Sequence, residues 1–308
     1  MSGCADNAGE RKAPPKAAFV GLATVDLVYF LEDIPPRNAK VSVAKQYIHA
    51  GGPAANAAIT FAFLGGSATL LTAVGRHPLA SVIHADLSAF SVSVQDMACE
   101  QHLPPPVSSI MVVQETGERT VVSANAKAFP PLRYEPDAEM LNGISIVLVD
   151  GHYMQTCIAI AQLAHSRGIP VVLDSGSWKQ GMEALLSHVE IAICSDDFRP
   201  PGCQTYADAL RFLIAQGIPK AAITRGAAPI CYADGGQTGE IPIDQVRALN
   251  TLGAGDIFHG AFCFSASQPD RTFPQSLAFA ARIASYSCQF PGTREWMQAF
   301  PRSEIAPA

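Results

Sequence analysis

The strongest chemical signal in the sequence is a run of small residues that ends in a carboxylate, Gly253-Ala254-Gly255-Asp256. A strand-like segment ends just before this run and an apolar helical pattern follows it, so the run lies at a helix N-terminus. Unpaired backbone N–H groups and the helix dipole favour an anion such as phosphate at that end. Asp256, in the first turn, could accept the proton of a hydroxyl that attacks the phosphate. The alternative is an ordinary glycine-rich turn in which Asp256 caps the helix.

A second polar cluster lies early in the chain, where Gly51 and Gly52 precede an expected helix that carries Asn56. A buried Asn needs hydrogen-bond partners, and a polyhydroxy ligand can supply them. The alternative is that Asn56 bonds the nearby backbone. Asp26 follows the first apolar strand run. Ligands of open α/β sheets bind beyond the carboxyl ends of strands, which favours Asp26 as a ligand contact over an exposed loop residue.

Apolar runs bounded by turn residues alternate along the chain with longer segments of helical pattern. This alternation is typical of a mostly parallel sheet covered by helices on both faces. The sequence predicts strands at 17–22, 68–74, 92–97, 144–149, 170–174, 189–194 and 219–224, a hairpin within 229–248, and helices at 53–64, 78–90, 154–167, 180–187, 204–216, 254–267 and 274–289.

Four further segments alternate in polarity, at 25–34, 41–49, 108–114 and 119–125. Such alternation predicts half-exposed antiparallel strands. Gly117 supplies a hairpin turn between the last two segments. The four segments therefore predict a small second sheet away from the main one.

The composition excludes several classes of protein. The chain has 308 residues, 48% hydrophobic and 16% charged, which builds a large core and is unlike a disordered protein. A net charge of -6 without a basic block argues against nucleic-acid binding. No apolar run approaches the roughly 20 residues of a membrane span.

The cysteines and the N-terminus indicate the cellular setting. No CxxC pair occurs among the eight cysteines, so zinc and thioredoxin-type chemistry have little support. Residues 1–16 are polar and lack the apolar core of a signal peptide. We therefore expect a reduced, cytoplasmic protein with a disordered tail at 1–16 and one domain at 17–308.

The two motifs, in this order, resemble those of the PfkB, or ribokinase-like, family of ATP-dependent sugar and nucleoside kinases. The resemblance covers about residues 17–295, and two shorter matches support it, Asp174 with Lys179 and Thr224 with Gly226. It implies an α/β fold, a three-layer sandwich with a mostly parallel central sheet and a small antiparallel β lid built from about 25–50 and 107–125.

The resemblance also implies a role for each matched residue. Asp256 would be the general base, and the amides of Gly253, Ala254 and Gly255 would form the anion hole. Asp26, Gly51, Gly52 and Asn56 would hold sugar hydroxyls, whereas Lys179, Thr224 and Gly226 would serve the ATP site. ATP with Mg²⁺ is the implied cofactor pair, and a homodimer through the lid is the implied assembly. Several stretches are most similar to the sulfofructose kinase and ketohexokinase branches, which implies a ketose or a ketose derivative as substrate.

Three positions depart from the family pattern. Asn250 stands where the family usually has an Asp near a monovalent cation, so the need for that cation is open. The usual Asn-x-x-Glu that organises Mg²⁺ is absent as such, since Ser195-Asp196-Asp197-Phe198 stands there, and the metal ligands are therefore unknown. His77 replaces another usual Asp. These departures keep two alternatives open, a nucleoside kinase on the same fold and a catalytically weak sugar-binding regulatory protein.

Overall fold

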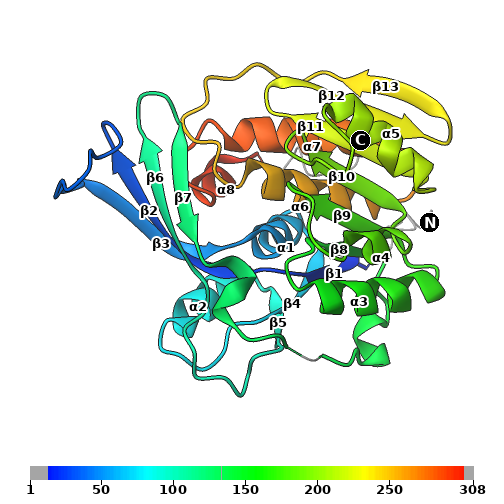
Figure 1. Ribbon diagram of the computed structural model, residues 1–308, viewed down its shortest axis with the longest axis horizontal. Coiled ribbons are helices and arrows are strands. Elements are labelled where there is room, and N and C mark those ends of the chain that lie inside the picture. Colours follow the sequence, from blue (N-terminus) through cyan, green and yellow to red (C-terminus); the bar gives the residue numbers. More distant parts are fainter. Residues whose placement is uncertain (1–12, 133, 302–308) are drawn as a thin grey trace, which may run out of the picture.

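Two sheets organise the molecule, a long one that carries the core and a short one that projects from its side (Figure 1). The computed structural model describes residues 13–132 and 134–301. The strands of the long sheet are β1 (Lys16–Val20), β4 (Ser67–Thr72), β5 (Ser93–Asp96), β8 (Ile146–Val149), β9 (Val171–Ser175), β10 (Ile191–Ser195), β11 (Lys220–Arg225), β12 (Ala228–Asp234) and β13 (Gln237–Ile241). Those of the short sheet are β2 (Thr24–Leu31), β3 (Lys45–Gly51), β6 (Val107–Val113) and β7 (Arg119–Ser123).

The helices are α1 (Pro53–Phe63), α2 (Ala80–Ala89), α3 (Met154–Ser166), α4 (Met182–Leu186), α5 (Tyr206–Ala215), α6 (Ala254–Ala266), α7 (Phe273–Ser287) and α8 (Glu295–Ala299), with short 3-10 turns at η1 (Asn125–Ala128) and η2 (Ala138–Leu141). Helices α2 to α5 lie between strands along the chain, α1 leads from β3 into β4, and α6, α7 and α8 follow the last strand. The sequence did not lead us to expect α8, which is a single short helix close to the C-terminal end of the described residues.

The long sheet has the strand order β13-β12-β11-β10-β9-β8-β1-β4-β5. All pairs from β5 to β11 are parallel, and the hairpin of β12 and β13 adds two antiparallel pairs at one edge. The carboxyl ends of the parallel strands therefore share one edge of the sheet, where the polar residues that follow them can meet.

Helices cover both faces of the long sheet, which confirms the three-layer sandwich (Figure 1). Successive side chains of a strand point to opposite faces, so each strand contributes to two separate cores. Phe19 of β1 packs in the core beneath α1, α6 and α7. Its neighbour Val20 packs in the core beneath α3, α4 and α5. Both side chains are fully buried, as near-continuous apolar strands require.

The short sheet, hereafter the lid, has the order β3-β2-β6-β7 and lies at the left of Figure 1. The pairs of β2 with β3 and of β6 with β7 are antiparallel, as the sequence predicts. The central pair of β2 and β6 is parallel, with Val25 opposite Val107, and here the prediction of antiparallel strands is wrong. A polarity period of two residues fixes which face a side chain takes but not the direction of the neighbouring strand.

The predicted disordered tail at 1–16 lies mostly outside the described residues. Lys16, its last residue, pairs with Ser67 as the first residue of β1. In the part of the chain that the structure describes, no helix is both long and apolar enough to cross a membrane.

Candidate active site

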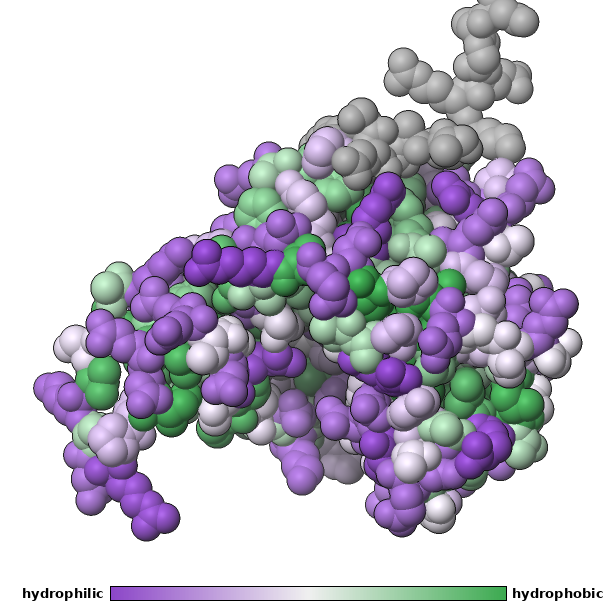
Figure 2. Space-filling view, turned by 90° about the horizontal axis from the view of Figure 1, so that it is seen from above, coloured by the Kyte–Doolittle hydropathy of each residue, from purple (hydrophilic) through white to green (hydrophobic). Residues whose placement is uncertain are grey.

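A cavity of about 710 Å³ lies at the carboxyl edge of the long sheet. It is lined by residues at or just beyond the ends of successive parallel strands, Asp150 after β8, Asp174 in β9, Ser195 in β10 and Thr224 in β11. The first turn of α6 lines another part of its wall. The space-filling view shows the surface hollowed between the lid, on the left, and the body (Figure 2). The cavity thus occupies the position where open α/β sheets bind their ligands.

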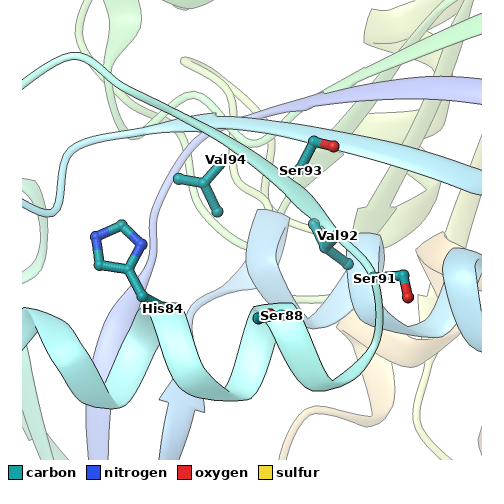
Figure 3. Close-up of a pocket in the computed structure, with 6 residues that line it drawn as sticks. All are labelled: His84, Ser88, Ser91, Val92, Ser93 and Val94. Carbon is teal, nitrogen blue, oxygen red and sulfur yellow. The ribbon is translucent and has the colours of Figure 1, made fainter.

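A second hollow lies over α2 and β5 and carries no comparable chemistry. It is lined by His84, Ser88, Ser91, Val92, Ser93 and Val94 (Figure 3). His84 is its one titratable side chain, and none of the residues that the sequence singled out lies there. The large cavity is therefore the candidate active site.

The run at 253–256 forms the N-terminus of α6, as predicted. Gly253 precedes the helix with a φ of 70°, a left-handed conformation that favours glycine. The amide of Ala254 donates a long bond of 3.3 Å to the carbonyl of Thr251. Among the described residues, the amides of Gly253 and Gly255 meet no hydrogen-bond acceptor. Both residues line the cavity, so these donors are available to an anion.

Asp256 projects from this first turn and lines the same cavity. Its Oδ2 accepts a hydrogen bond of 2.8 Å from Nδ2 of Asn56. Burial, and next the charge of Asp174, raise the pKa of Asp256 from 3.8 to about 7, against the lowering effect of the Asn56 hydrogen bond. A carboxyl group with a pKa close to neutral suits a general base.

Asn56 is buried in α1 and has both ends of its amide in use. Its Oδ1 accepts a 3.0 Å hydrogen bond from Nη1 of Arg294. Because a guanidinium only donates, this contact turns the amide so that Nδ2 faces Asp256. Nη2 of Arg294 is itself held by the carbonyl of Ala50 at 2.9 Å and by Asp86 at 3.1 Å.

Arg294 was not expected from the sequence, because it lies just before α8 and far from either motif. The signal that could have found it is a single cation in a C-terminal stretch, 291–300, that also carries Trp296, Met297 and Phe300. An Arg in such a stretch is seldom buried without a partner.

Asp26 and Gly51 lie against one another in the lid's first pair of strands. Asp26 is buried, and its Oδ1 accepts a 2.5 Å hydrogen bond from the hydroxyl of Thr24. Burial raises the pKa of Asp26, while the Thr24 hydrogen bond and the charge of His49 lower it. A Cβ atom at position 51 would overlap the Asp26 carboxylate, so a side chain there would displace Asp26. Gly52 then turns the chain into α1 with a φ of 94°.

The residues assigned to the nucleotide line the same cavity as Asp256. Nζ of Lys179 donates to the carbonyl of Asp150 at 3.2 Å, and the hydroxyl of Thr224 donates to the carbonyl of Cys194 at 3.4 Å. Gly226 lies in the tight turn after β11. The structure therefore brings together the residues of the second motif and both shorter matches.

The lid reaches the loop that leads into α6. Nη1 of Arg119, at the start of β7, donates a 2.5 Å hydrogen bond to the hydroxyl of Thr251. Both residues line the cavity. The lid thus contributes a cation at the rim beside the unpaired amides of α6.

Two of the positions that depart from the family pattern make contacts within the protein. Oδ1 of Asn250 accepts from the amide of Leu252 at 2.9 Å, and its Nδ2 has no partner among the described residues. Asp196 is paired with Arg199 at 3.1 Å. Within residues 13–132 and 134–301, no group of three or more His, Cys, Asp or Glu side chains could hold a metal ion.

Comparison with known proteins finds relatives that match most of the chain. The model of the pfkB family of carbohydrate kinases matches residues 14–299. Ribokinase of Arabidopsis thaliana is 26% identical, with 93% of this chain and 79% of the relative covered. Ketohexokinase of Mus musculus is 21% identical, with 89% and 96% covered.

Solved structures show the same fold. A protein from Agrobacterium tumefaciens superposes with a TM-score of 0.85 at 24% identity, covering 95% of this chain and 96% of that one. Arabidopsis thaliana ribokinase complexed with ribose and ATP superposes with a TM-score of 0.74 at 22% identity, covering 95% and 97%. At these identities the structural likeness shows the fold alone.

Proposed function

The chain belongs to the pfkB family of carbohydrate kinases, and we propose that it transfers the terminal phosphoryl group of ATP to a hydroxyl of a small sugar, a ketose or ketose derivative. Membership makes the protein a phosphotransferase. The proposal adds the acceptor and the residues that act on it.

One observation carries the proposal, the position of the Asp256 carboxylate beside the unpaired amides of Gly253 and Gly255 at the start of α6. Asp256 accepts the proton of the sugar hydroxyl, whose oxygen then forms a bond to the terminal phosphorus. The bond from that phosphorus to the bridging oxygen of the nucleotide breaks. The N–H groups of these amides stabilise the negative charge on the phosphoryl oxygens by hydrogen bonding.

The first motif supplies the sugar contacts in this proposal. Asn56 lies next to Asp256, so a hydroxyl that meets the base also meets this amide. Asp26, which the Gly51 backbone approaches closely, is proposed to accept a hydrogen bond from a second hydroxyl. Its carboxylate is buried, and Asp26 is not among the residues that line the cavity. Gly52 sets the direction of α1 and therefore of Asn56.

Lys179, Thr224 and Gly226 are proposed to serve the nucleotide at the other side of Asp256. ATP supplies the phosphoryl group, and Mg²⁺ neutralises its phosphates. Mg²⁺ needs few protein ligands when phosphates and water complete its shell. Asp196 and Asp197 line the cavity and are proposed to contact that water shell, which agrees with the lack of a three-ligand cluster among the described residues.

The lid is the proposed dimer surface. It exposes Ile48 at 54%, Val121 at 48% and Val122 at 64% on its strands. Apolar side chains on an open sheet are stabilised by a second copy that covers them. The cysteines of the described residues are free thiols, and we propose a reducing, cytoplasmic setting for them.

The test is ADP release from ATP and Mg²⁺ with a panel of ketoses, aldoses, sugar acids and nucleosides. We expect turnover with a ketose or ketose derivative and a loss of roughly 10²–10⁴ in kcat for Asp256→Asn. Glu183→Gln, an exposed carboxylate change on α4, is the matched control. Turnover with nucleosides alone would favour the nucleoside kinase, whereas sugar binding without turnover would favour the regulatory protein.

A further inference from the structure

His259 is a buried histidine whose two ring nitrogens both face carbonyl oxygens. It lies one turn after Gly255 in α6 and is 4% exposed. Nδ1 is 2.7 Å from the carbonyl oxygen of Gly255, and Nε2 is 3.1 Å from that of Ile193 in β10. Carbonyl oxygens only accept, and a neutral imidazole has a single N–H group. Both contacts are hydrogen bonds only if the ring is an imidazolium.

A counter-ion for this cation lies beside it. Oδ2 of Asp174, at the end of β9, is 3.4 Å from Nδ1 of His259. That oxygen has no hydrogen-bond partner among the described residues, so its charge is balanced by proximity to His259. A buried charge is costly unless an opposite charge accompanies it, and each member of the pair supplies that for the other.

We propose that His259 is held as an imidazolium by Asp174 and is a positioning residue that keeps Asp256 able to ionise. The inference rests on the proposed function of Asp256 as the base. His259 also holds the Gly255 carbonyl, and hence the plane of the peptide bond that carries the Asp256 N–H.

The charges around Asp174 and Asp256 show how an imidazolium at His259 affects the ionisation of Asp256. Asp256 faces Asp174 from β9 and Asp26 from β2, and both raise its pKa, whereas His259 lowers it. Asp174 is buried, which raises its pKa; His259, Lys179 and His152 oppose that effect, and Asp150 adds to it. Without the positive charge of His259, the negative charge of Asp174 would be less well balanced. The pKa of Asp256 would then be higher.

The protonation state is tested directly on the intact protein. In protein labelled with ¹⁵N-histidine, and with His259→Gln used to assign the signals, we expect both ring nitrogens of His259 to show the shift of a protonated nitrogen at pH 7.5. One protonated and one unprotonated nitrogen at pH 7.5 would overturn the proposal.

The effect on Asp256 is tested by its own titration, which needs no turnover. In protein with ¹³C-labelled Asp carboxyl groups, assigned through Asp256→Asn, we expect His259→Gln to raise the titration midpoint of Asp256 by about one unit. Adding Asp174→Asn to that variant removes the unbalanced charge and should lower the midpoint again. An unchanged midpoint in both variants would leave His259 a structural residue and overturn its role. If no sugar is phosphorylated, the kinase proposal fails, yet these two measurements still decide the state of His259.

Discussion

Nδ2 of Asn56 donates a 2.8 Å hydrogen bond to Oδ2 of Asp256 across 200 residues of sequence. This bond joins the two motifs into one site, and close packing of α1 and α6 makes it possible. Gly260 lies on the face of α6 that touches α1, where a Cβ atom would overlap the carbonyl oxygen of Ala57. The absence of a side chain at position 260 therefore lets Asn56 reach Asp256.

The first prediction concerns this helix contact. Gly260→Ala should force α1 and α6 apart, because the new methyl group meets backbone rather than a flexible side chain. We expect a loss of about 1–3 kcal/mol in the free energy of unfolding and a lower kcat as Asn56 moves from Asp256. Urea unfolding and steady-state kinetics measure the two effects. If Gly260→Ala has the wild-type free energy of unfolding and the wild-type kcat, the two helices can adjust to the methyl group, and their close packing does not determine the position of Asn56.

The second prediction is a gain of stability when the base is neutralised. The pKa of Asp256 is about 7 when folded and has an ordinary value of 3.8, so the folded state binds more protons between these limits. Stability from this group therefore falls as pH rises through that window, and the penalty is complete above pH 7. Asp256→Asn removes the penalty and should raise the free energy of unfolding at pH 8 by about 1–4 kcal/mol, with little difference at pH 4.

Urea unfolding of the wild type and Asp256→Asn at pH 4 and pH 8 measures this difference. A variant that is less stable at pH 8 than the wild type would contradict the prediction and show that the carboxylate is well solvated or well paired in the cavity.

The third prediction concerns Arg294, which holds Asn56, Ala50 and Asp86 at once. Arg294→Lys keeps the charge, but one ammonium group cannot reproduce the fork of donors. We expect kcat to fall about tenfold as the Asn56 amide loses its orientation, and stability to fall by about 1–3 kcal/mol. Arg211→Lys is the matched control, because Arg211 pairs with Asp208 on the surface with 73% of its side chain exposed. If Arg294→Lys and Arg211→Lys have the same kcat, Arg294 does not position the Asn56 amide.

The fourth prediction concerns the contact of Gly51 with Asp26. Gly51→Ala should displace the Asp26 carboxylate, because the added carbon occupies its place. We expect a higher KM for the sugar and a lower melting temperature. The double variant Gly51→Ala with Asp26→Ala relieves the overlap, so its melting temperature should recover while sugar binding stays weak. Recovery of sugar binding in the double variant would show that Asp26 does not contact the substrate.

The fifth prediction concerns assembly through the lid. Ile48→Lys with Val122→Lys places charges on the exposed apolar face of β3 and β7 and should prevent a dimer from forming there. Sedimentation equilibrium of the wild type and the variant measures this directly. A substitution of the same kind outside the lid, Ile214→Lys in α5, is the control, since Ile214 is 40% exposed. A wild-type monomer would contradict the proposed dimer, and a dimer that survives the double variant would place the dimer contact outside this face of the lid.

Local patterns in the sequence predict the helices and strands of the long sheet and locate the two motifs. Buried strands, amphipathic helices and glycine turns follow from local sterics and periodic burial, so the strands and helices of the long sheet begin and end within a few residues of expectation. The start of α6 is an example, since Gly253 takes at little steric cost the left-handed conformation that precedes the helix. The second motif therefore predicted that Gly253 and Asp256 would stand at the start of a helix.

Contacts between residues far apart in the sequence are visible only in the folded structure. The parallel pair of β2 and β6, the buried Arg294 behind Asn56, and the two carbonyl contacts of His259 depend on packing between segments far apart in sequence. A single Arg or His carries no local pattern that reveals its partner. The direction of β6 beside β2 and the protonation of the His259 ring depend on residues that come close only when the chain has folded.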